Sequence, residues 1–257
     1  MELDPEIYDL ITPASFRGDV EWYRRRAREC GGPVLELGAG TGRITIAMAR
    51  EGATVHALDA DAPMLNRLRQ KLAAEPADVR ARVSVHEGDM RTFALPERFA
   101  LIVCPFRAFL HNVGEADRLA CLGRIRAHLR PGGVFAFNIF HPSLEYMAQH
   151  AGPSAGTWRW VATFPREDGS VVVRSEANRY DTVRQIVRSL HRFEEFGRDG
   201  ILKRTVLHQL ELAYLYPPDV RRLLEHSGFA SVTISGGFDG GPFAHDADEL
   251  VIEATLA

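Results

Sequence analysis

The most constraining segment of this chain is residues 34–43, where three glycines stand at every second position after a short apolar run. The segment reads Val34-Leu35-Glu36-Leu37-Gly38-Ala39-Gly40-Thr41-Gly42-Arg43. A helical pattern follows in residues 44–50, so the sequence predicts a buried strand, a tight turn and a helix start. Because glycine has no Cβ atom, such a turn lets backbone approach a ligand closely, and free N–H groups of the helix start point at it.

The spacing of the glycines bears on the kind of ligand. A dinucleotide fingerprint has the pattern Gly-x-Gly-x-x-Gly, whose third glycine packs the helix against the strand. Here the third glycine, Gly42, comes one residue early, and Arg43 stands in the expected place. The pattern therefore disfavours an NAD-dependent oxidoreductase. An ordinary strand-to-helix turn without a ligand stays open as the simpler interpretation.

The first part of the chain alternates between strand and helix patterns. Residues 1–30 predict two helices before the first strand. Strands are then predicted at 34–37, 54–58, 83–86, 99–104 and 133–140, with helices at 41–50, 62–74 and 115–129. Apolar, β-rich runs separated by helical patterns indicate a doubly wound α/β fold, a mostly parallel sheet with helices on both faces.

The alternation ends after residue 140. Four β-rich runs, residues 157–164, 171–180, 183–193 and 201–214, are separated by Asp168-Gly169, Asp181-Thr182 and Asp199-Gly200. Asp-Gly between strands favours a hairpin, so these runs predict an antiparallel β-meander. A helix at 217–227 and strands at 230–235 and 250–255 complete the chain. We therefore expect one α/β domain, residues 1–150 and 215–257, with an inserted subdomain at residues 151–214.

Composition limits the class of protein. The 257 residues carry a net charge of -3, so no overall basic field attracts nucleic acid. The three cysteines, Cys30, Cys104 and Cys121, are odd in number and lack Cys-x-x-Cys spacing, which argues for a reducing compartment and against a zinc site. No apolar stretch approaches the ~20 residues that a membrane-spanning helix needs. These features predict a cytoplasmic protein without a metal.

Acidic residues follow the next two strands. Asp59 lies 17 residues after Gly42, at the end of the second predicted strand, where a carboxylate can accept hydrogen bonds from a ribose diol. By itself it suits NAD equally well. Asp89 follows the third predicted strand within Glu87-Gly88-Asp89-Met90. Both residues also suit a helix N-cap or a turn.

Together, the Glu-x-Gly-x-Gly-x-Gly pattern and the strand ends behind it resemble the class I S-adenosylmethionine-dependent methyltransferases over residues 34–140. More narrowly, the chain is similar to bacterial small-molecule N- and O-methyltransferases. The resemblance implies a Rossmann-like sheet of seven strands whose final strand is antiparallel, with the inserted meander over the ligand crevice. It implies S-adenosyl-L-methionine as cofactor, S-adenosyl-L-homocysteine as product, and no metal. The residues it implies at the cofactor are Tyr8, Glu36, Gly38, Ala39, Gly40, Asp59, Ala60, Met64, Asp89, Met90 and Cys104.

The expected reaction is attack by a nucleophile in line with the methyl–sulfur bond of the sulfonium, about 3 Å away. A neutral amine needs no prior deprotonation, whereas a hydroxyl benefits from a general base. His111 and His141 follow the fourth and fifth predicted strands and are the predicted catalytic residues, although each also suits a structural histidine. Substrate contacts are expected from Phe106, Arg107, Trp158 and Tyr180. The aromatic residues suit sheet packing too, and Arg107 a solvated surface.

We expect a small-molecule substrate, methylated at nitrogen or oxygen, as the partner, with no nucleic acid and no membrane. A homodimer is left open. A nucleic-acid or protein methyltransferase is the alternative, but the Asn/Asp-Pro-Pro-Tyr pattern typical of enzymes that methylate base amines is replaced by Cys104-Pro105-Phe106-Arg107. A binding protein that keeps the fold without turnover also stays open.

Overall fold

The computed structural model describes residues 3–12, 18–141, 143–150, 152–243 and 249–256. The chain divides into two compact units. The mixed-sheet unit draws on residues 16–141 and 215–257, and the antiparallel unit on residues 1–15 and 142–214. It stays a prediction that residues 1–150 and 215–257 bind the cofactor and that residues 151–214 contact the substrate.

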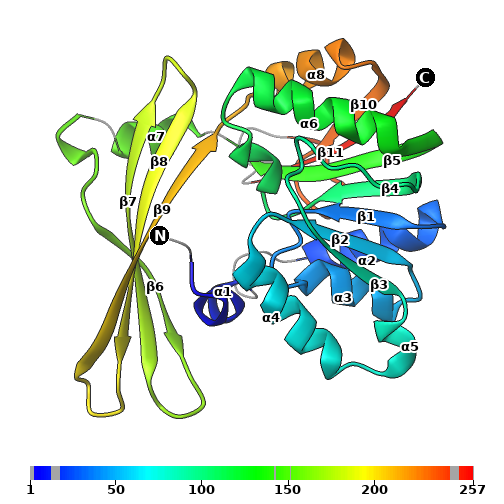
Figure 1. The fold of residues 1–257 in the computed structure, drawn as a ribbon. Helices are drawn as coiled ribbons and strands as arrows, with labels where there is room; N and C mark the ends of the chain where they lie inside the picture. Colours follow the sequence, from blue (N-terminus) through cyan, green and yellow to red (C-terminus); the bar gives the residue numbers. More distant parts are fainter. Residues whose placement is uncertain (1–2, 13–17, 142, 151, 244–248, 257) are drawn as a thin grey trace. The chain divides into compact units, whose positions relative to one another are not determined.

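The mixed-sheet unit is built on a sheet of seven strands (Figure 1). These are β1 (Val34–Leu37), β2 (Val55–Asp59), β3 (Val83–Glu87), β4 (Phe99–Cys104), β5 (Leu129–Phe140), β10 (Phe229–Ser235) and β11 (Glu249–Leu256). Their order across the sheet is β10-β11-β5-β4-β1-β2-β3. Strand β11 is antiparallel to both of its neighbours, and the pairs among β1 to β5 are parallel. The predicted fold class is therefore confirmed.

Helices cover both faces of this sheet (Figure 1). They are α2 (Asp19–Cys30), α3 (Arg43–Arg50), α4 (Ala62–Ala73), α5 (Ala77–Arg80), α6 (Glu115–His128) and α8 (Pro217–His226). Trp22 and Tyr23 of α2 pack with Met48 of α3 against β1, β2, β4, β5 and β11. Such burial of apolar surface from both layers is the main stabilisation of an α/β sheet.

The antiparallel unit holds a sheet of four strands in the order β6-β7-β8-β9. The strands are β6 (Arg159–Pro165), β7 (Val171–Asp181), β8 (Ile186–Phe196) and β9 (Leu202–Ala213). Helix α1 (Pro5–Ile11) packs Ile7 and Ile11 against Val172, Phe193 and Val206 of this sheet. A short helix α7 (Leu144–Gln149) and a 3₁₀ turn η2 (Gly152–Ser154) precede β6. The predicted antiparallel meander is confirmed.

The predicted start of the strand at residue 183 is wrong, because β8 begins at Ile186. The carboxylate of Asp181 accepts the backbone N–H groups of Val183 and Arg184, and Gln185 has a left-handed φ of 55°. The turn is therefore longer than the apolar pattern suggests, and Val183 is 93% exposed. A β-branched residue in a turn resembles a strand residue in sequence, which explains the error.

Smaller differences concern helix ends and short helices. The helix predicted from Thr41 begins at Arg43, because its N-cap Gly42 is left-handed with φ 81°. Helices α5 and α7 were not predicted, since four and six residues are too short to show a helical period. Among the residues that the structure describes, no helix is both long and apolar enough to cross a membrane.

The left-handed Gly42 generates a stability prediction. A Cβ atom on Gly42 would lie 2.1 Å from Cδ1 of Leu68, a fully buried side chain, whereas one on Gly52 (φ 95°) meets nothing within 4 Å. Gly52→Ala should therefore cost only the strain of the left-handed backbone, about 1–2 kcal/mol. Gly42→Ala should cost roughly 1–3 kcal/mol more through overpacking. Urea unfolding of both variants measures this, and equal losses would contradict it.

Candidate functional site

The glycine turn follows β1 and is held against the end of β2. Gly38, Gly40 and Gly42 have φ values of 72°, 55° and 81°, which side chains rarely adopt. The N–H groups of Gly38 and Ala39 both donate to the carbonyl oxygen of Leu58, at 2.9 and 3.1 Å. The N–H of Gly40 donates to Oδ2 of Asp59 at 2.7 Å.

These bonds use the N–H groups of the turn itself, and the expectation that free N–H groups of the helix start point at a ligand stays a prediction. The donors of Gly38, Ala39 and Gly40 are already used within the protein, so they cannot serve a phosphate. In a planar trans peptide the carbonyl points opposite to the N–H. The carbonyl of Gly38 lies in the same peptide plane as the N–H of Ala39. Because that N–H points toward Leu58, the Gly38 carbonyl points away from Leu58 and is a hydrogen-bond acceptor on the other side of the turn. Such a turn suits a cationic group better than a pyrophosphate.

Asp59 is tied to the turn at one oxygen and to the start of α4 at the other. Its Oδ1 accepts the N–H of Asp61 at 2.9 Å. Burial raises the pKa of Asp59, although the N–H donors of Asp61 and Gly40 oppose the shift. Asp61 caps α4 by accepting the N–H of Met64 at 3.0 Å. The predicted residues Ala60 and Met64 thus flank a fixed carboxylate, with Ala60 exposed and Met64 buried.

Glu36 lies in the core at the middle of the sheet. It is 2% exposed, and its Oε2 accepts the hydroxyl of Thr45 on α3 at 2.5 Å. Burial raises the pKa of Glu36 to about 8, against the opposing effects of the Thr45 hydroxyl and the Arg43 charge. At neutral pH this side chain is therefore mainly protonated. It joins β1 to the helix that follows the glycine turn.

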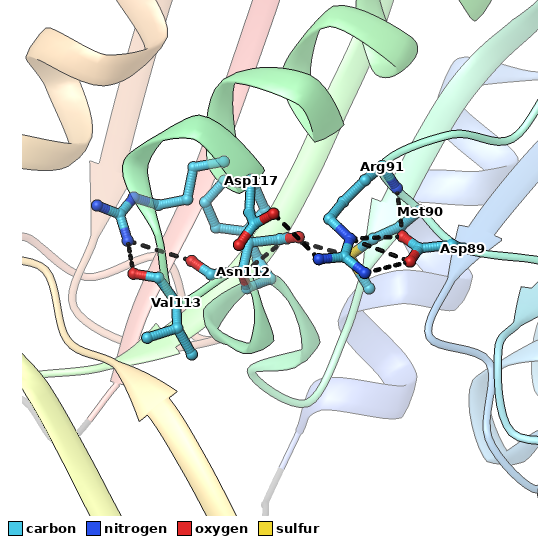
Figure 2. Close-up of polar contacts among 8 residues, drawn as sticks. Asp89, Met90, Arg91, Asn112, Val113 and Asp117 are labelled. Atoms are coloured by element: carbon cyan, nitrogen blue, oxygen red, sulfur yellow. Dashed lines mark hydrogen bonds and ion pairs between the residues drawn. The ribbon is translucent and has the colours of Figure 1, made fainter.

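The segment after β3 forms an ion-pair cluster with α6, which Figure 2 shows. Arg91 donates to both carboxylate oxygens of Asp89, with Nε 2.9 Å from Oδ1, and its Nη1 lies 3.0 Å from Oδ1 of Asp117. The hydrogen bonds from Arg91 lower the pKa of Asp89, although burial opposes them. Asp89 is thus held as an anion in a fixed orientation.

Met90 and the segment after β4 lie beside the glycine turn. A Cβ atom on Gly38 would lie 2.6 Å from Cβ of Ala108 and 3.9 Å from Cε of Met90. Asn112, which is buried, donates from Nδ2 to the sulfur of Met90 at 3.2 Å and to the carbonyl of Phe109 at 3.0 Å (Figure 2). The structure therefore brings the ends of β1, β3 and β4 to one edge of the sheet.

A strained turn follows β4 directly. Phe106 and Arg107 are consecutive non-glycine residues with left-handed φ values of 56° and 65°. Asn138 holds this turn, since its Oδ1 accepts both the N–H of Phe106 and the hydroxyl of Tyr23, each at 2.9 Å. Its Nδ2 donates to Glu249 at 2.6 Å. Strained backbone persists where surrounding contacts enforce it, and it concentrates at functional sites.

Arg107 has a partner that the sequence did not suggest. Its guanidinium contacts both oxygens of the buried Glu249, the shortest distance being 2.6 Å. The carboxylate that pairs with Arg107 is therefore supplied by the protein itself. The role of Arg107 in substrate binding stays a prediction. The turn leads directly into the 3₁₀ helix η1 (Ala108–His111), of which Arg107 is the N-cap.

The remaining predicted residues fall in several places. Cys104 ends β4 with a fully buried side chain, and burial raises the pKa of its thiol. A cofactor would therefore meet its backbone rather than its sulfur. His111 is exposed at the end of η1, and the ring of His141 packs edge-on against Phe243 at 5.0 Å. Within the described residues, no group of three or more histidines, cysteines or acids could hold a metal ion.

Three predicted residues belong to the antiparallel unit. Tyr8 lies in α1, and the ring of Trp158 stacks on the guanidinium of Arg192 at 4.7 Å. Tyr180 of β7 contacts the rings of Tyr146 and Tyr214, with centroids 6.4 and 5.8 Å apart. Their functional roles stay predictions.

Sequence reasoning missed Arg91, Asn112, Asn138 and Glu249. For Asn138 a signal was present, because it is a lone amide in the apolar strand Val134-Phe135-Ala136-Phe137-Asn138-Ile139-Phe140. A buried polar side chain in such a strand needs hydrogen-bond partners and thus indicates a network. Glu249 lies 142 residues from its partner Arg107, and no local pattern connects the two.

Comparisons with known proteins agree with this geometry. Residues 34–133 match the methyltransferase domain family. The chain is 28% identical to the cypemycin N-terminal methyltransferase of a Streptomyces species, over 96% of this chain and 93% of that protein. It superposes on the CcbJ methyltransferase from Streptomyces caelestis with a TM-score of 0.81 and 25% identity, covering 98% and 96% of the two chains. It also superposes on the glycopeptide N-methyltransferase MtfA complexed with S-adenosyl-L-methionine, with a TM-score of 0.59, 29% identity and coverage of 95% and 96%.

Burial of Glu36 predicts a pH dependence of stability. Because its folded pKa of about 8 exceeds its ordinary value of 4.5, its contribution is fully present below pH 4.5 and is lost as pH rises toward 8. Each tenfold difference between the acid dissociation constants of the folded and unfolded states corresponds to about 1.4 kcal/mol. In Glu36→Gln, the free energy of unfolding should therefore fall less between pH 5 and 8 than in the wild type.

Urea unfolding across this pH range measures the effect. The control is Glu225→Gln, which removes an exposed carboxylate on α8 and should behave as the wild type does. Identical slopes of stability against pH for all three proteins would refute the role of Glu36.

Proposed function

We propose that the chain is an S-adenosylmethionine-dependent methyltransferase of class I that methylates an amine nitrogen of a small molecule. The observation that carries the cofactor is the carboxylate of Asp59, fixed at the end of β2 by the N–H of Gly40. Support for nitrogen as acceptor comes from one relative named as an N-terminal methyltransferase and another named as a glycopeptide N-methyltransferase. An oxygen acceptor is the second choice. The comparisons do not favour a nucleic-acid or protein acceptor.

The donors and acceptors at the sheet edge fit this cofactor. A ligand with an ammonium group and a sulfonium needs hydrogen-bond acceptors and negative partial charge. The turn provides the carbonyl of Gly38, whereas the N–H groups of Gly38, Ala39 and Gly40 are bonded within the protein. A carboxylate oxygen can accept more than one hydrogen bond, so Asp59 can still receive a ribose hydroxyl. We propose the glycine turn with Glu36 for the methionine part, and Asp59 with Ala60 and Met64 for the ribose.

We propose that the segments after β3 and β4 bind the adenine ring of the cofactor. Asp89 is oriented by Arg91 and can accept from an exocyclic amine, and Met90 offers an apolar side chain steadied by Asn112. The backbone of Cys104, at the end of β4, is proposed to contact the cofactor at the same edge of the sheet. Tyr8 is proposed for the methionine part.

When bound, the cofactor would supply an electrophilic methyl group, to which a nitrogen lone pair would form a bond as the carbon–sulfur bond breaks and S-adenosyl-L-homocysteine leaves. The protein's part is alignment of the two reactants. The strained turn at Phe106 and Arg107, fixed by Asn138, gives a rigid surface at the end of β4. After transfer, the new ammonium releases a proton to water or to a nearby base. His111 and His141 are the proposed bases, with substrate contacts from Phe106, Arg107, Trp158 and Tyr180.

We further propose a cytoplasmic location and no metal requirement. The three cysteines are free, and Cys104 and Cys121 are buried, as expected of thiols kept reduced. The sulfonium makes the methyl group electrophilic without a Lewis acid.

The function is tested by binding and then by turnover. Calorimetry should show S-adenosyl-L-methionine binding more tightly than NAD, because the N–H groups of the glycine turn are used within the protein. Incubation with the cofactor and a panel of amines and matching alcohols should add the mass of one CH₂ group to an amine, because a methyl group replaces a hydrogen on nitrogen. Tighter binding of NAD would overturn the assignment of the cofactor. Methylation confined to alcohols would overturn nitrogen as the acceptor atom.

The same assay tests the proposed bases. If an amine is the acceptor, His111→Ala and His141→Ala should each retain turnover at saturating substrate, because a neutral amine needs no base before attack. Loss of turnover with unchanged cofactor affinity would identify that histidine as essential.

Asp59 generates a prediction about affinity. Asp59→Ala should weaken S-adenosyl-L-methionine binding by roughly 1–3 kcal/mol, because charge-assisted bonds to the ribose are lost. Asp61→Ala is the matched control, since it removes the cap of α4 but no proposed cofactor contact. Calorimetry on both variants measures the difference. Unchanged affinity in Asp59→Ala would remove Asp59 from the site.

A further inference from the structure

A chain of opposite charges joins the first turn of α6 to the segment after β3. Figure 2 shows the guanidinium of Arg91 between two carboxylates, those of Asp89 and Asp117. The three side chains are 33–43% exposed. Exposed ion pairs contribute little to the stability of a protein. The stability of the fold therefore does not account for this arrangement, whereas its effect on the carboxylate of Asp89 does.

Arg91 uses most of the acceptor capacity of Asp89. Oδ1 of Asp89 accepts the backbone N–H of Arg91 at 2.8 Å and its Nε at 2.9 Å. Oδ2 accepts Nη2 and shares the Nε of Arg91 at 3.0 Å. A carboxylate has about four lone-pair sites, so the capacity that is left for a further donor lies on Oδ2. Asp89 is therefore set to receive one more N–H group, from one direction.

The contribution of Arg91 to Asp89 is orientation rather than charge. The hydrogen bonds from Arg91 lower the pKa of Asp89, but its ordinary pKa of 3.8 already makes it an anion at pH 7. Without Arg91 the carboxylate would stay charged and would be able to turn about its side-chain bonds. A side chain that is fixed before a ligand arrives loses less conformational entropy on binding, which favours the ligand.

The same turn of α6 also holds the residue after Asp89. Arg118 of α6 donates from Nη1 to the carbonyl oxygen of Asn112 at 3.1 Å, and Nδ2 of Asn112 donates to the sulfur of Met90 at 3.2 Å (Figure 2). The segment after β3 is thus connected to one helix turn at two neighbouring positions. These contacts restrain the segment itself, and the contact with Arg91 restrains the carboxylate that the segment carries.

We propose that Arg91 and Asp117 are positioning residues that fix the carboxylate of Asp89 for the exocyclic amine of the cofactor's adenine ring. The amine donates hydrogen bonds, whereas the 6-oxo group of hypoxanthine is an acceptor that a fixed carboxylate repels. A fixed Asp89 therefore makes the site specific for adenine, and a mobile Asp89 can turn away from a 6-oxo group. This inference rests on the proposed function, because it concerns the acid that is proposed there for the adenine amine.

The test compares two ligands that differ at this position, S-adenosyl-L-homocysteine and S-inosyl-L-homocysteine. Calorimetry on the full chain measures both dissociation constants. The wild type should bind the adenine compound at least about tenfold more tightly, because a hydrogen bond to a charged group is replaced by two facing acceptors. Arg91→Ala should remove most of this preference. Arg91→Lys keeps the charge but not the planar pair of donors, and should reduce the preference as well.

Asp117→Ala tests the more distant of the two residues. It removes the carboxylate that lies 3.0 Å from Arg91, and it should reduce the preference for adenine less than Arg91→Ala does. Asp78→Ala is the matched control, because Asp78 is also an acid in the first turn of a helix and pairs with an arginine, Arg82, at 2.8 Å. This control should retain the full preference.

A double-mutant cycle shows whether Arg91 acts through Asp89. Asp89→Ala alone should abolish the preference, and adding Arg91→Ala to it should then leave the ratio of the two affinities unchanged. A merely structural role of Arg91 would weaken both ligands by the same factor in the Arg91→Ala single variant, and the preference for adenine would survive there.

The outcomes separate this inference from the proposed function. Failure of the wild type to bind S-adenosyl-L-homocysteine would contradict the function itself. Where the wild type binds it, equal affinity for the two ligands, or an unchanged ratio of affinities in Arg91→Ala, would overturn the positioning role. Thermal unfolding without ligand identifies a variant that fails to fold, and in that case Arg91→Lys decides.

Discussion

The hydrogen bond from the N–H of Gly40 to the carboxylate of Asp59 is the interaction on which the candidate cofactor site depends. It ties the turn after β1 to the end of β2, two strands that are parallel neighbours. It also uses one of the donors that a phosphate-binding turn would present, while the neighbouring N–H groups go to Leu58. The same bond that stabilises the turn therefore leaves it fewer N–H donors for a pyrophosphate, which supports the proposal that it binds a cation and a ribose.

The end of β4 is organised by a second polar centre, the amide of Asn138. A buried amide is costly unless its donors and acceptor find partners, and here Tyr23, Phe106 and Glu249 provide them. Glu249 in turn neutralises Arg107, so a left-handed turn and a buried acid stabilise each other. This network explains how two consecutive non-glycine residues keep a strained backbone at the sheet edge.

Periodic features of the fold could be predicted from the sequence. The alternation of apolar runs, the spacing of Gly38, Gly40 and Gly42, and the Asp-Gly hairpins are local signals, and the strand order agreed with the resemblance they supported. The start of β8 was missed because Asp181 extends the turn through side-chain bonds that hydropathy does not register. The pairing of Arg107 with Glu249 was missed because two distant charges carry no local sign of contact. Local chemistry was predictable, and long-range pairing was not.

The acids of the site show why residue type alone could not settle their roles. Glu36, buried and hydrogen-bonded to the neutral hydroxyl of Thr45, has its pKa raised to about 8, whereas Arg91 lowers the pKa of Asp89. Asp59 is subject to both influences, because burial raises its pKa and two backbone N–H groups oppose the shift. Burial and partners, not position in the motif, thus decide which acid is neutral and which is charged. The fold therefore gives a neutral acid on β1 and an anion after β3, from residues that look alike in the sequence.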